Sequence, residues 1–244
     1  MEIKNSVAFV SGANRGIGKA FVEELLKAGV AKIYAAARNP EQLSDLLATD
    51  PERIVPVTLD ISNPQMVRAA AENSDVTILI NNAGIAAFAG FIAAEDSDAA
   101  RGEMETNYFG TLDMTRAFAP VLAANGGGAI VNLASIASHI NFPVLGSYSA
   151  SKAAVHSMTQ GVRAELAAQG TLVIGVYPGP VDTDMAENFP IDKTPPNTVA
   201  KIVLEAVEAG EEDVYPDPTS LELHAGLLGD PKAVEKQTGT MLPG

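Results

Sequence analysis

A tyrosine and a lysine stand four residues apart in the segment Tyr148-Ser149-Ala150-Ser151-Lys152. On a helix, side chains with this spacing lie on one face, one turn apart. An ammonium group beside a phenol favours the phenolate, and so lowers the phenol pKa from its usual value of about 10. Such a tyrosine can protonate a carbonyl oxygen while hydride arrives at the carbon. A surface pair without chemistry would show the same spacing, so the pattern needs support from elsewhere in the chain.

Further polar residues fall where α/β sheets place their chemistry. Ser135 follows an apolar run, and Asn81-Asn82-Ala83-Gly84 ends another. Ligands of open parallel sheets bind at the carboxyl ends of the strands. Asn107 lies within a long helical stretch, where a polar side chain facing the core needs a partner. These positions predict one polar site that includes the tyrosine and the lysine.

The first apolar run leads directly into the glycine-rich segment Ser11-Gly12-Ala13-Asn14-Arg15-Gly16-Ile17-Gly18. Glycine lets the backbone turn sharply and approach a ligand without a Cβ clash. The helix that follows offers free N–H groups and a positive dipole end to a pyrophosphate. A tight turn that needs glycine only for packing is the alternative. Three glycines within seven residues after the first strand favour a phosphate ligand.

The end of the second apolar run indicates which dinucleotide is bound. A site for NAD usually places a carboxylate there for the ribose 2′-hydroxyl. Here the run ends in Ala37-Arg38, and no carboxylate occurs until Glu41. The guanidinium of Arg38 can pair with a 2′-phosphate, and Arg15 is a second cation in reach. Solvated surface arginines are the alternative, but their joint placement favours NADP(H).

Apolar runs alternate with helical stretches along the whole chain. Continuous apolar strands are typical of a parallel sheet covered on both faces. The predicted strands are Val7–Ser11, Lys32–Ala36, Ile54–Leu59, Thr77–Asn81, Ala129–Ala134, Leu172–Tyr177 and Asp213–Tyr215. The predicted helices are Gly16–Ala28, Pro40–Leu47, Pro64–Ala71, Asp98–Leu122, Ser149–Ala168 and Asn197–Ala209. The alternation predicts one α/β domain over residues 1–244, with a doubly wound parallel sheet of about seven strands. Residues 182–196 are expected to form a loop, and the tail 216–244 gives only a weak helical signal.

Composition excludes several classes of function. The 244 residues contain no cysteine and three histidines, none at a metal-ligand spacing, so we expect no metal. With 16 Lys and Arg against 30 Asp and Glu, the formal charge is −14, which disfavours nucleic acid and anionic membranes. Apolar runs are too short to span a bilayer. We therefore expect a soluble cytoplasmic protein.

The motifs together resemble the short-chain dehydrogenase/reductase family over nearly the whole chain, from Val7 to about Tyr215. Each alone is weak, but they occur in the family's order, with the family's usual gap between Ser135 and Tyr148. The matching pieces are Gly12-x-x-x-Gly16-x-Gly18, Asp60, Asn81-Asn82-Ala83-Gly84, Asn107, Ser135, Tyr148 with Lys152, and Pro178-Gly179. The resemblance implies a single-domain Rossmann fold and an NADP(H)-preferring carbonyl reductase.

The resemblance also implies a role for each matching residue. Tyr148 would be the general acid or base, Lys152 would bind the nicotinamide ribose and lower the tyrosine pKa, and Ser135 would orient the substrate oxygen. Asn107 would hold a water in a proton relay to Lys152. The remaining cofactor-binding residues would be Gly12, Asn14, Arg15, Gly16, Ile17, Gly18, Arg38, Asp60, Ile61, Asn82, Ala83, Gly84, Pro178, Gly179, Val181 and Thr183.

The substrate is less defined by the sequence. Apolar residues near the predicted sheet edge suggest a small or medium apolar ketone or aldehyde, or the corresponding alcohol, although such residues often serve packing alone. A 3-oxoacyl thioester on an acidic carrier protein is an alternative that the charge of −14 disfavours. A non-catalytic NADPH sensor or scaffold is another. The pocket candidates are Ala86, Phe88, Ile136, His139, Phe142, Leu145, Met185 and Phe189.

Small residues on two of the predicted helices point to self-association. Ala153, Ala154, Ser157 and Gly161 are closely spaced, and small side chains let helices approach each other. Packing against the protein's own core is the alternative. In the resembling family these helices build subunit interfaces, so we expect a homodimer or a homotetramer.

Overall fold

Seven parallel strands form one sheet in the order β3-β2-β1-β4-β5-β6-β7 in the computed structural model, which describes residues 1–187 and 191–243. The strands are β1 (Val7–Ser11), β2 (Lys32–Ala37), β3 (Ile54–Thr58), β4 (Ile78–Asn81), β5 (Gly128–Leu133), β6 (Thr171–Val176) and β7 (Asp213–Val214). From β1 the chain first builds outward to β3 and then returns to the other side of β1, where it builds outward to β7. Sheets of this kind bind dinucleotides in the crevice at the point where the strand order reverses, here between β1 and β4. The predicted doubly wound α/β fold is confirmed.

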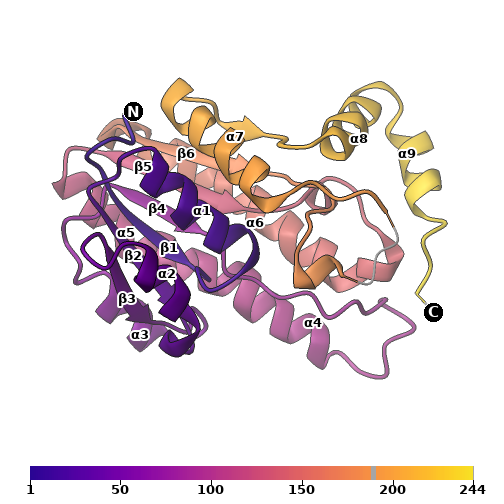
Figure 1. Cartoon of the computed structure of the whole chain (residues 1–244). Coiled ribbons are helices and arrows are strands. Elements are labelled where there is room, and N and C mark those ends of the chain that lie inside the picture. The colour runs from indigo at the N-terminus through magenta and orange to yellow at the C-terminus, as the bar shows by residue number, and fades with distance from the viewer. Residues whose placement is uncertain (188–190, 244) are drawn as a thin grey trace.

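Helices cover both faces of the sheet (Figure 1). They are α1 (Gly16–Lys27), α2 (Ser44–Thr49), α3 (Pro64–Ala70), α4 (Asp98–Glu103), α5 (Thr111–Ala124), α6 (Gly146–Leu166), α7 (Pro196–Ala209), α8 (Pro218–Gly229) and α9 (Pro231–Thr238). In the part of the chain that the structure describes, none is long and apolar enough to cross a membrane.

Alternate side chains of the strands pack into two separate hydrophobic cores, one on each face of the sheet. Val10 of β1 packs in the cluster that holds Phe21 of α1 and Val203 of α7. Its neighbour Phe9 points the other way, and its ring lies 4.9 Å from that of Phe118 of α5. Successive strand residues face opposite sides of a sheet, so a continuously apolar strand fills both layers.

The structure differs from the predicted helices mainly in one place. The predicted helix Asp98–Leu122 is interrupted by a π-helical segment, Met104–Gly110, between α4 and α5. Hydrophobic periodicity does not show such a segment, because one wide turn shifts the apolar face only slightly. The helix α6 begins at Gly146, three residues earlier than predicted, so Tyr148 and Lys152 both lie within it.

The tail forms two helices, α8 and α9, which lie at one end of the molecule (yellow in Figure 1). Asp217 caps α8 by accepting a hydrogen bond from the backbone N–H of Ser220 at 2.9 Å, and Pro218 occupies the first helical position. A capping aspartate followed by proline is a helix-start signal that predicts α8 at this point.

Candidate active site

A cavity of about 800 Å³ opens at the carboxyl ends of the strands. It takes its walls from the glycine turn, the ends of β2 to β6, the start of α6, and the tail. Most of the predicted site residues line it, namely Gly12, Asn14, Arg15, Gly16, Ile17, Arg38, Asp60, Ile61, Asn82, Ala83, Gly84, Ser135, Tyr148, Lys152, Pro178, Gly179, Val181 and Thr183. The predicted cofactor and catalytic residues therefore meet in one space.

Two of the glycines in the turn have left-handed backbone conformations. Gly12 has φ +66° and Gly16 has φ +53°, a region that side chains with a Cβ rarely adopt. Gly18 does not line the cavity. A Cβ there would overlap the carbonyl oxygen of Gly12, so this glycine lets α1 begin directly under the turn. The turn thus has the shape of a phosphate cradle at a helix N-terminus.

Ser11 and Asn82 hold the glycine turn against the end of β4. The Ser11 hydroxyl accepts hydrogen bonds from the backbone N–H groups of Asn82 at 3.0 Å and Ala83 at 3.1 Å. The Asn82 amide donates to the carbonyl oxygens of Ser11 at 2.9 Å and Gly12 at 3.1 Å. These bonds fix two neighbouring strand ends at the crevice, and so shape the cradle before any ligand arrives.

Two arginines, Arg15 and Arg38, line the cavity near the glycine turn and the end of β2. Arg38 is exposed and follows β2. Two hydrogen bonds from Ser62 hold the pKa of Asp60 below its ordinary value, and the charge of Arg38 contributes to this effect. Arg15 donates to Asp184 at 2.9 Å, and both side chains are about two-thirds exposed (67% and 68%). An exposed ion pair of this kind contributes little stability, so Arg15 can exchange Asp184 for a ligand phosphate at small cost.

The catalytic candidates Ser135, Tyr148 and Lys152 all line the cavity. Lys152 is 5% exposed, and its ammonium donates to the carbonyl oxygen of Leu133 at 2.7 Å and lies 5.7 Å from the centre of the Tyr148 ring. Burial lowers the pKa of Lys152 to about 8. Burial raises the pKa of Tyr148 to about 12, although its hydrogen bond with Ser135 opposes the rise. In the protein alone, Tyr148 therefore holds its proton, and the expected lowering by Lys152 is not seen.

Asn107 lies in the π-helical segment and is fully buried, outside the cavity lining. Its amide oxygen accepts from the N–H of Ile85 at 2.8 Å, and its amide nitrogen donates to the carbonyl of Ile85 and the hydroxyl of Ser151, each at 2.9 Å. Asn107 thereby joins the end of β4 to α6, one residue from Lys152. Single wide helical turns are frequent at functional sites.

Most of the predicted pocket residues also line the cavity. These are Ala86, Phe88, Ile136, Phe142, Leu145 and Met185. The prediction for Phe189 falls outside the residues that the structure describes.

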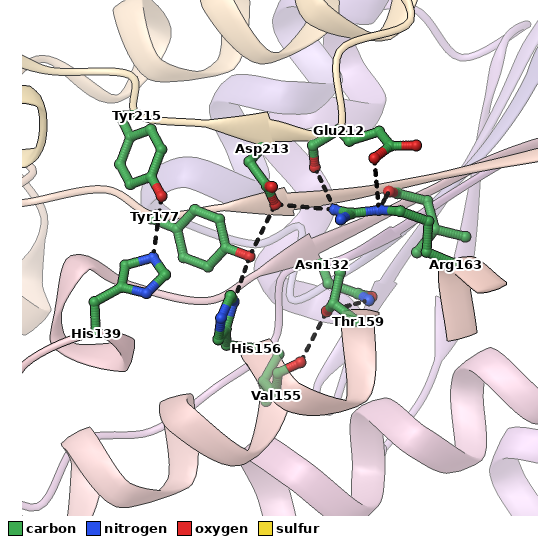
Figure 2. Close-up of polar contacts among 11 residues, drawn as sticks. Asn132, His139, Val155, His156, Thr159, Arg163, Tyr177, Glu212, Asp213 and Tyr215 are labelled. Carbon is green, nitrogen blue, oxygen red and sulfur yellow. Dashed lines mark hydrogen bonds and ion pairs between the residues drawn. The ribbon is translucent and has the colours of Figure 1, made fainter. Parts of the chain in front are cut away.

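The prediction that His139 lines the pocket is wrong. Its ring Nε2 lies 3.2 Å from the Tyr215 hydroxyl, and its ring packs 4.5 Å from those of His156 and Tyr177 (Figure 2). The backbone after Ser135 makes a turn of 3₁₀ helix that directs the histidine behind the site, toward β7. All three histidines gather there, since His224 of α8 stacks on Tyr215 with ring centres 3.9 Å apart.

The tail supplies a wall of the cavity that the sequence analysis did not assign. Residues of α8 and α9 line the cavity, and the N–H of Val144, near Tyr148, donates to the carbonyl of Met241 at 2.9 Å. Asp217 accepts from the N–H of Gly179 at 2.7 Å, which ties α8 to the end of β6. The capping signal at Asp217 could have located this wall. Its lining residues are Thr219, Glu222, Leu223, Gly226, Val234, Gln237, Thr238 and Met241.

Known proteins resemble this chain in sequence and in fold. Residues 6–194 match the family model described as short chain dehydrogenase. A short chain dehydrogenase of Monascus purpureus is 34% identical over 208 residues, which cover 80% of this chain and 70% of that protein. A short chain dehydrogenase of Burkholderia cenocepacia, solved in complex with NADP, is 46% identical with a TM-score of 0.93, and the match covers 98% of this chain and 99% of that one.

A third relative was solved with the other dinucleotide. The short chain dehydrogenase/reductase of Burkholderia phymatum, in complex with NAD, is 25% identical with a TM-score of 0.80, over 93% of this chain and 96% of that one. Together with the cradle and the buried tyrosine and lysine, these matches establish the family. The chain belongs to the short-chain dehydrogenases, oxidoreductases that use a nicotinamide dinucleotide.

Proposed function

We propose that this protein is an NADP(H)-dependent carbonyl reductase that converts small or medium apolar ketones or aldehydes to alcohols, and catalyses the reverse oxidation. The observation that carries the proposal is that Ser135, Tyr148 and Lys152 line one cavity together with apolar side chains such as Ile136, Phe142 and Leu145. Bound NADPH supplies the hydride for the carbonyl carbon.

The protein's own residues handle the proton and the developing charge. Tyr148 gives its phenolic proton to the carbonyl oxygen, and its burial keeps that proton in place until the transfer. The Ser135 hydroxyl, at the end of β5, orients the same oxygen and stabilises its negative charge in the transition state. Lys152, which would bind the nicotinamide ribose, holds a positive charge that offsets the phenolate left on Tyr148. Asn107 holds α6 in place for both residues.

Preference for NADP(H) over NAD(H) rests on the end of β2. Arg38 follows Ala37 there, and both Arg38 and the nearby Arg15 line the cavity. A guanidinium matches the oxygens of a 2′-phosphate, whereas the ribose hydroxyl of NAD calls for a carboxylate. The NADP bound to the relative from Burkholderia cenocepacia supports this choice.

The test is NADPH consumption with a panel of aliphatic and aromatic aldehydes and ketones, compared between the wild type and Tyr148→Phe. We expect turnover of at least one apolar carbonyl, and a loss of about 10²- to 10⁴-fold in the variant, with unchanged NADPH binding. NADPH binding without turnover of any carbonyl would favour a sensor instead. Comparable activity of the two proteins would exclude Tyr148 as the acid.

A further inference from the structure

A buried carboxylate lies beside the site, and the chemistry proposed above does not use it. Glu103 is the last residue of α4 and has no exposed surface. Its Oε1 accepts a hydrogen bond from the backbone N–H of Ala87 at 2.7 Å. Its Oε2 is buried and has no hydrogen-bond partner among residues 1–187 and 191–243. Burying a carboxylate with an unpaired oxygen costs free energy, so its presence calls for a function.

Glu103 and Asn107 hold the same piece of chain. They are four residues apart, across the junction of α4 and the π-helical segment. Asn107 binds both backbone groups of Ile85, and Glu103 binds the N–H of Ala87 two residues later. The segment from Gly84 to Phe88 forms a cavity wall, in which four of the five residues line the space. Glu103 therefore fixes the part of this wall around Ala87.

The carboxylate also acts on the tyrosine. The helix α4 packs against α6, which carries Tyr148. The charge of Glu103 raises the pKa of Tyr148, in addition to the larger effect of burial, and opposes the hydrogen bond from Ser135. The lowering of the tyrosine pKa expected from Lys152, 5.7 Å from the centre of the ring, is not seen. The wall from Gly84 to Phe88 carries no titratable side chain. Glu103 is thus the charged group whose effect on the phenol favours its protonated form.

We propose that Glu103 is a positioning residue that fixes the cavity wall through Ala87 and, through the charge on its free oxygen, keeps the proton on Tyr148. This inference rests on the proposed function, because it concerns the acid of that reaction. A tyrosine that keeps its proton at neutral pH is ready to donate it to a carbonyl oxygen. Glu103 accordingly favours the protonated form of Tyr148, which donates in reduction, and its removal makes the phenolate form that accepts a proton in oxidation easier to reach at a given pH.

The test compares Glu103→Gln with Glu105→Gln, because Glu105 is an exposed carboxylate two residues away in the same segment. Glutamine keeps an oxygen for the Ala87 N–H and removes the charge. The pH profiles of kcat/KM for both directions should shift to lower pH by about one unit in Glu103→Gln, the order expected when a charge that opposes ionisation is removed from the packed neighbour of α6. The Glu105→Gln profile should stay in place. Profiles of Glu103→Gln that coincide with the wild type would overturn the role of the charge.

A second variant and a second measurement keep the test independent of folding and of turnover. Glu103→Asp keeps the charge but shortens the side chain, so we expect a raised KM for the carbonyl and a profile close to the wild type. An unchanged KM there would overturn the role in fixing the wall. Ionisation of Tyr148 can also be followed without substrate by titrating the tyrosinate absorbance. The contribution of Tyr148 is the difference between each protein and the same protein that also carries Tyr148→Phe. Earlier ionisation in Glu103→Gln supports the inference even if no carbonyl is reduced, and identical ionisation contradicts it.

Discussion

Asp217 accepts a hydrogen bond from the backbone N–H of Gly179 at 2.7 Å with one carboxylate oxygen, and caps α8 with the other. Asp217 is 3% exposed, so both bonds are shielded from water. One side chain therefore joins the loop after β6, which carries predicted cofactor-binding residues, to the helix α8, which forms part of the tail wall of the cavity.

Replacing this carboxylate should affect stability and substrate binding together. Asp217→Ala leaves the N–H of Gly179 and the first turn of α8 without their acceptor, at a cost of about 2–4 kcal/mol in the free energy of unfolding. We expect a higher KM for the carbonyl as well, measured with NADPH saturating. Asp230→Ala is the matched control, because Asp230 caps α9 at an exposed position. Equal KM values in wild type and Asp217→Ala would show that α8 does not depend on this link.

Cofactor preference should depend on Arg38. Arg38→Asp removes a guanidinium that can bind the 2′-phosphate and adds a carboxylate that suits a ribose hydroxyl. We expect the ratio of kcat/KM for NADPH over NADH to fall by about 10- to 100-fold, the worth of one or two charge-assisted hydrogen bonds. Arg68→Asp, at an exposed position of α3, makes the same charge change away from the cavity. An unchanged ratio in Arg38→Asp would assign the phosphate to Arg15.

The burial of Lys152 should lower the stability of the folded protein at neutral pH, and this cost should depend on pH. Its pKa in the folded protein is about 8, below the ordinary value of 10.5. Below pH 8 both states hold the proton, so the folded protein bears the full cost of a buried charge. Lys152→Met should therefore raise the free energy of unfolding by about 1–3 kcal/mol at pH 7 while abolishing turnover. The gain should shrink as the pH rises from 8 to 10.5, because the unfolded chain then holds the proton longer than the folded one. Denaturant titrations of the cofactor-free proteins at a series of pH values measure this difference.

Acid should destabilise the protein through the cluster of histidines. Burial, with a smaller contribution from the neighbouring histidine charges, lowers the pKa of His139 to about 4. Between pH 6.5 and pH 4 the unfolded chain binds the proton that the folded protein excludes, so stability falls as the pH drops through this range. His139→Gln should lose less of its Tm between pH 7 and pH 5, by about 2–4 °C after allowance for the solvent exposure of the ring. An equal loss in both proteins would place the acid sensitivity elsewhere.

Self-association remains a prediction that the exposed face of α6 makes specific. Ser157 and Gly161 are exposed and one turn apart, and a Cβ at Gly161 would meet nothing within 4 Å. We expect the mass in solution to be that of a dimer or a tetramer at micromolar concentration. Gly161→Arg should lower it by blocking close approach, whereas Gly229→Arg, at an equally open position on α8, should not. A monomeric wild type would contradict the prediction.

The sheet and the cofactor end of the cavity were predictable because local signals mark them. Apolar runs showed the strands, and the glycines of the turn sit where the backbone needs left-handed conformations, as at Gly12. The resemblance to a family then placed Tyr148, Lys152 and Ser135 in one site. What could not be predicted depends on contacts between distant segments. His139 follows Ser135 closely in sequence, but its direction is set by a turn and by partners such as Tyr215.

The same reason explains why Glu103 and the tail escaped notice. Glutamates are common on helices, and only the packing of α4 against α6 reveals that this one is buried. The aromatic cluster behind the site likewise draws its members from segments far apart in the sequence, so no sequence window contains it. Its members are His139, His156, Tyr177, Tyr215 and His224.

The two ends of the cavity can form at different times during synthesis of the chain, because the tail wall lies far along the sequence from the glycine turn. The glycine turn, the end of β2 and the end of β4 are translated before the catalytic residues Ser135, Tyr148 and Lys152, and α8 and α9 are translated after them. Domains begin to form as the chain emerges, the N-terminal part first. A nascent chain thus acquires its nucleotide-binding end early, while the bond between Val144 and Met241 can form only after α8 and α9 have been made. A frameshift or proteolytic trimming beyond Asp217 would spare every catalytic side chain and still leave the substrate without its wall.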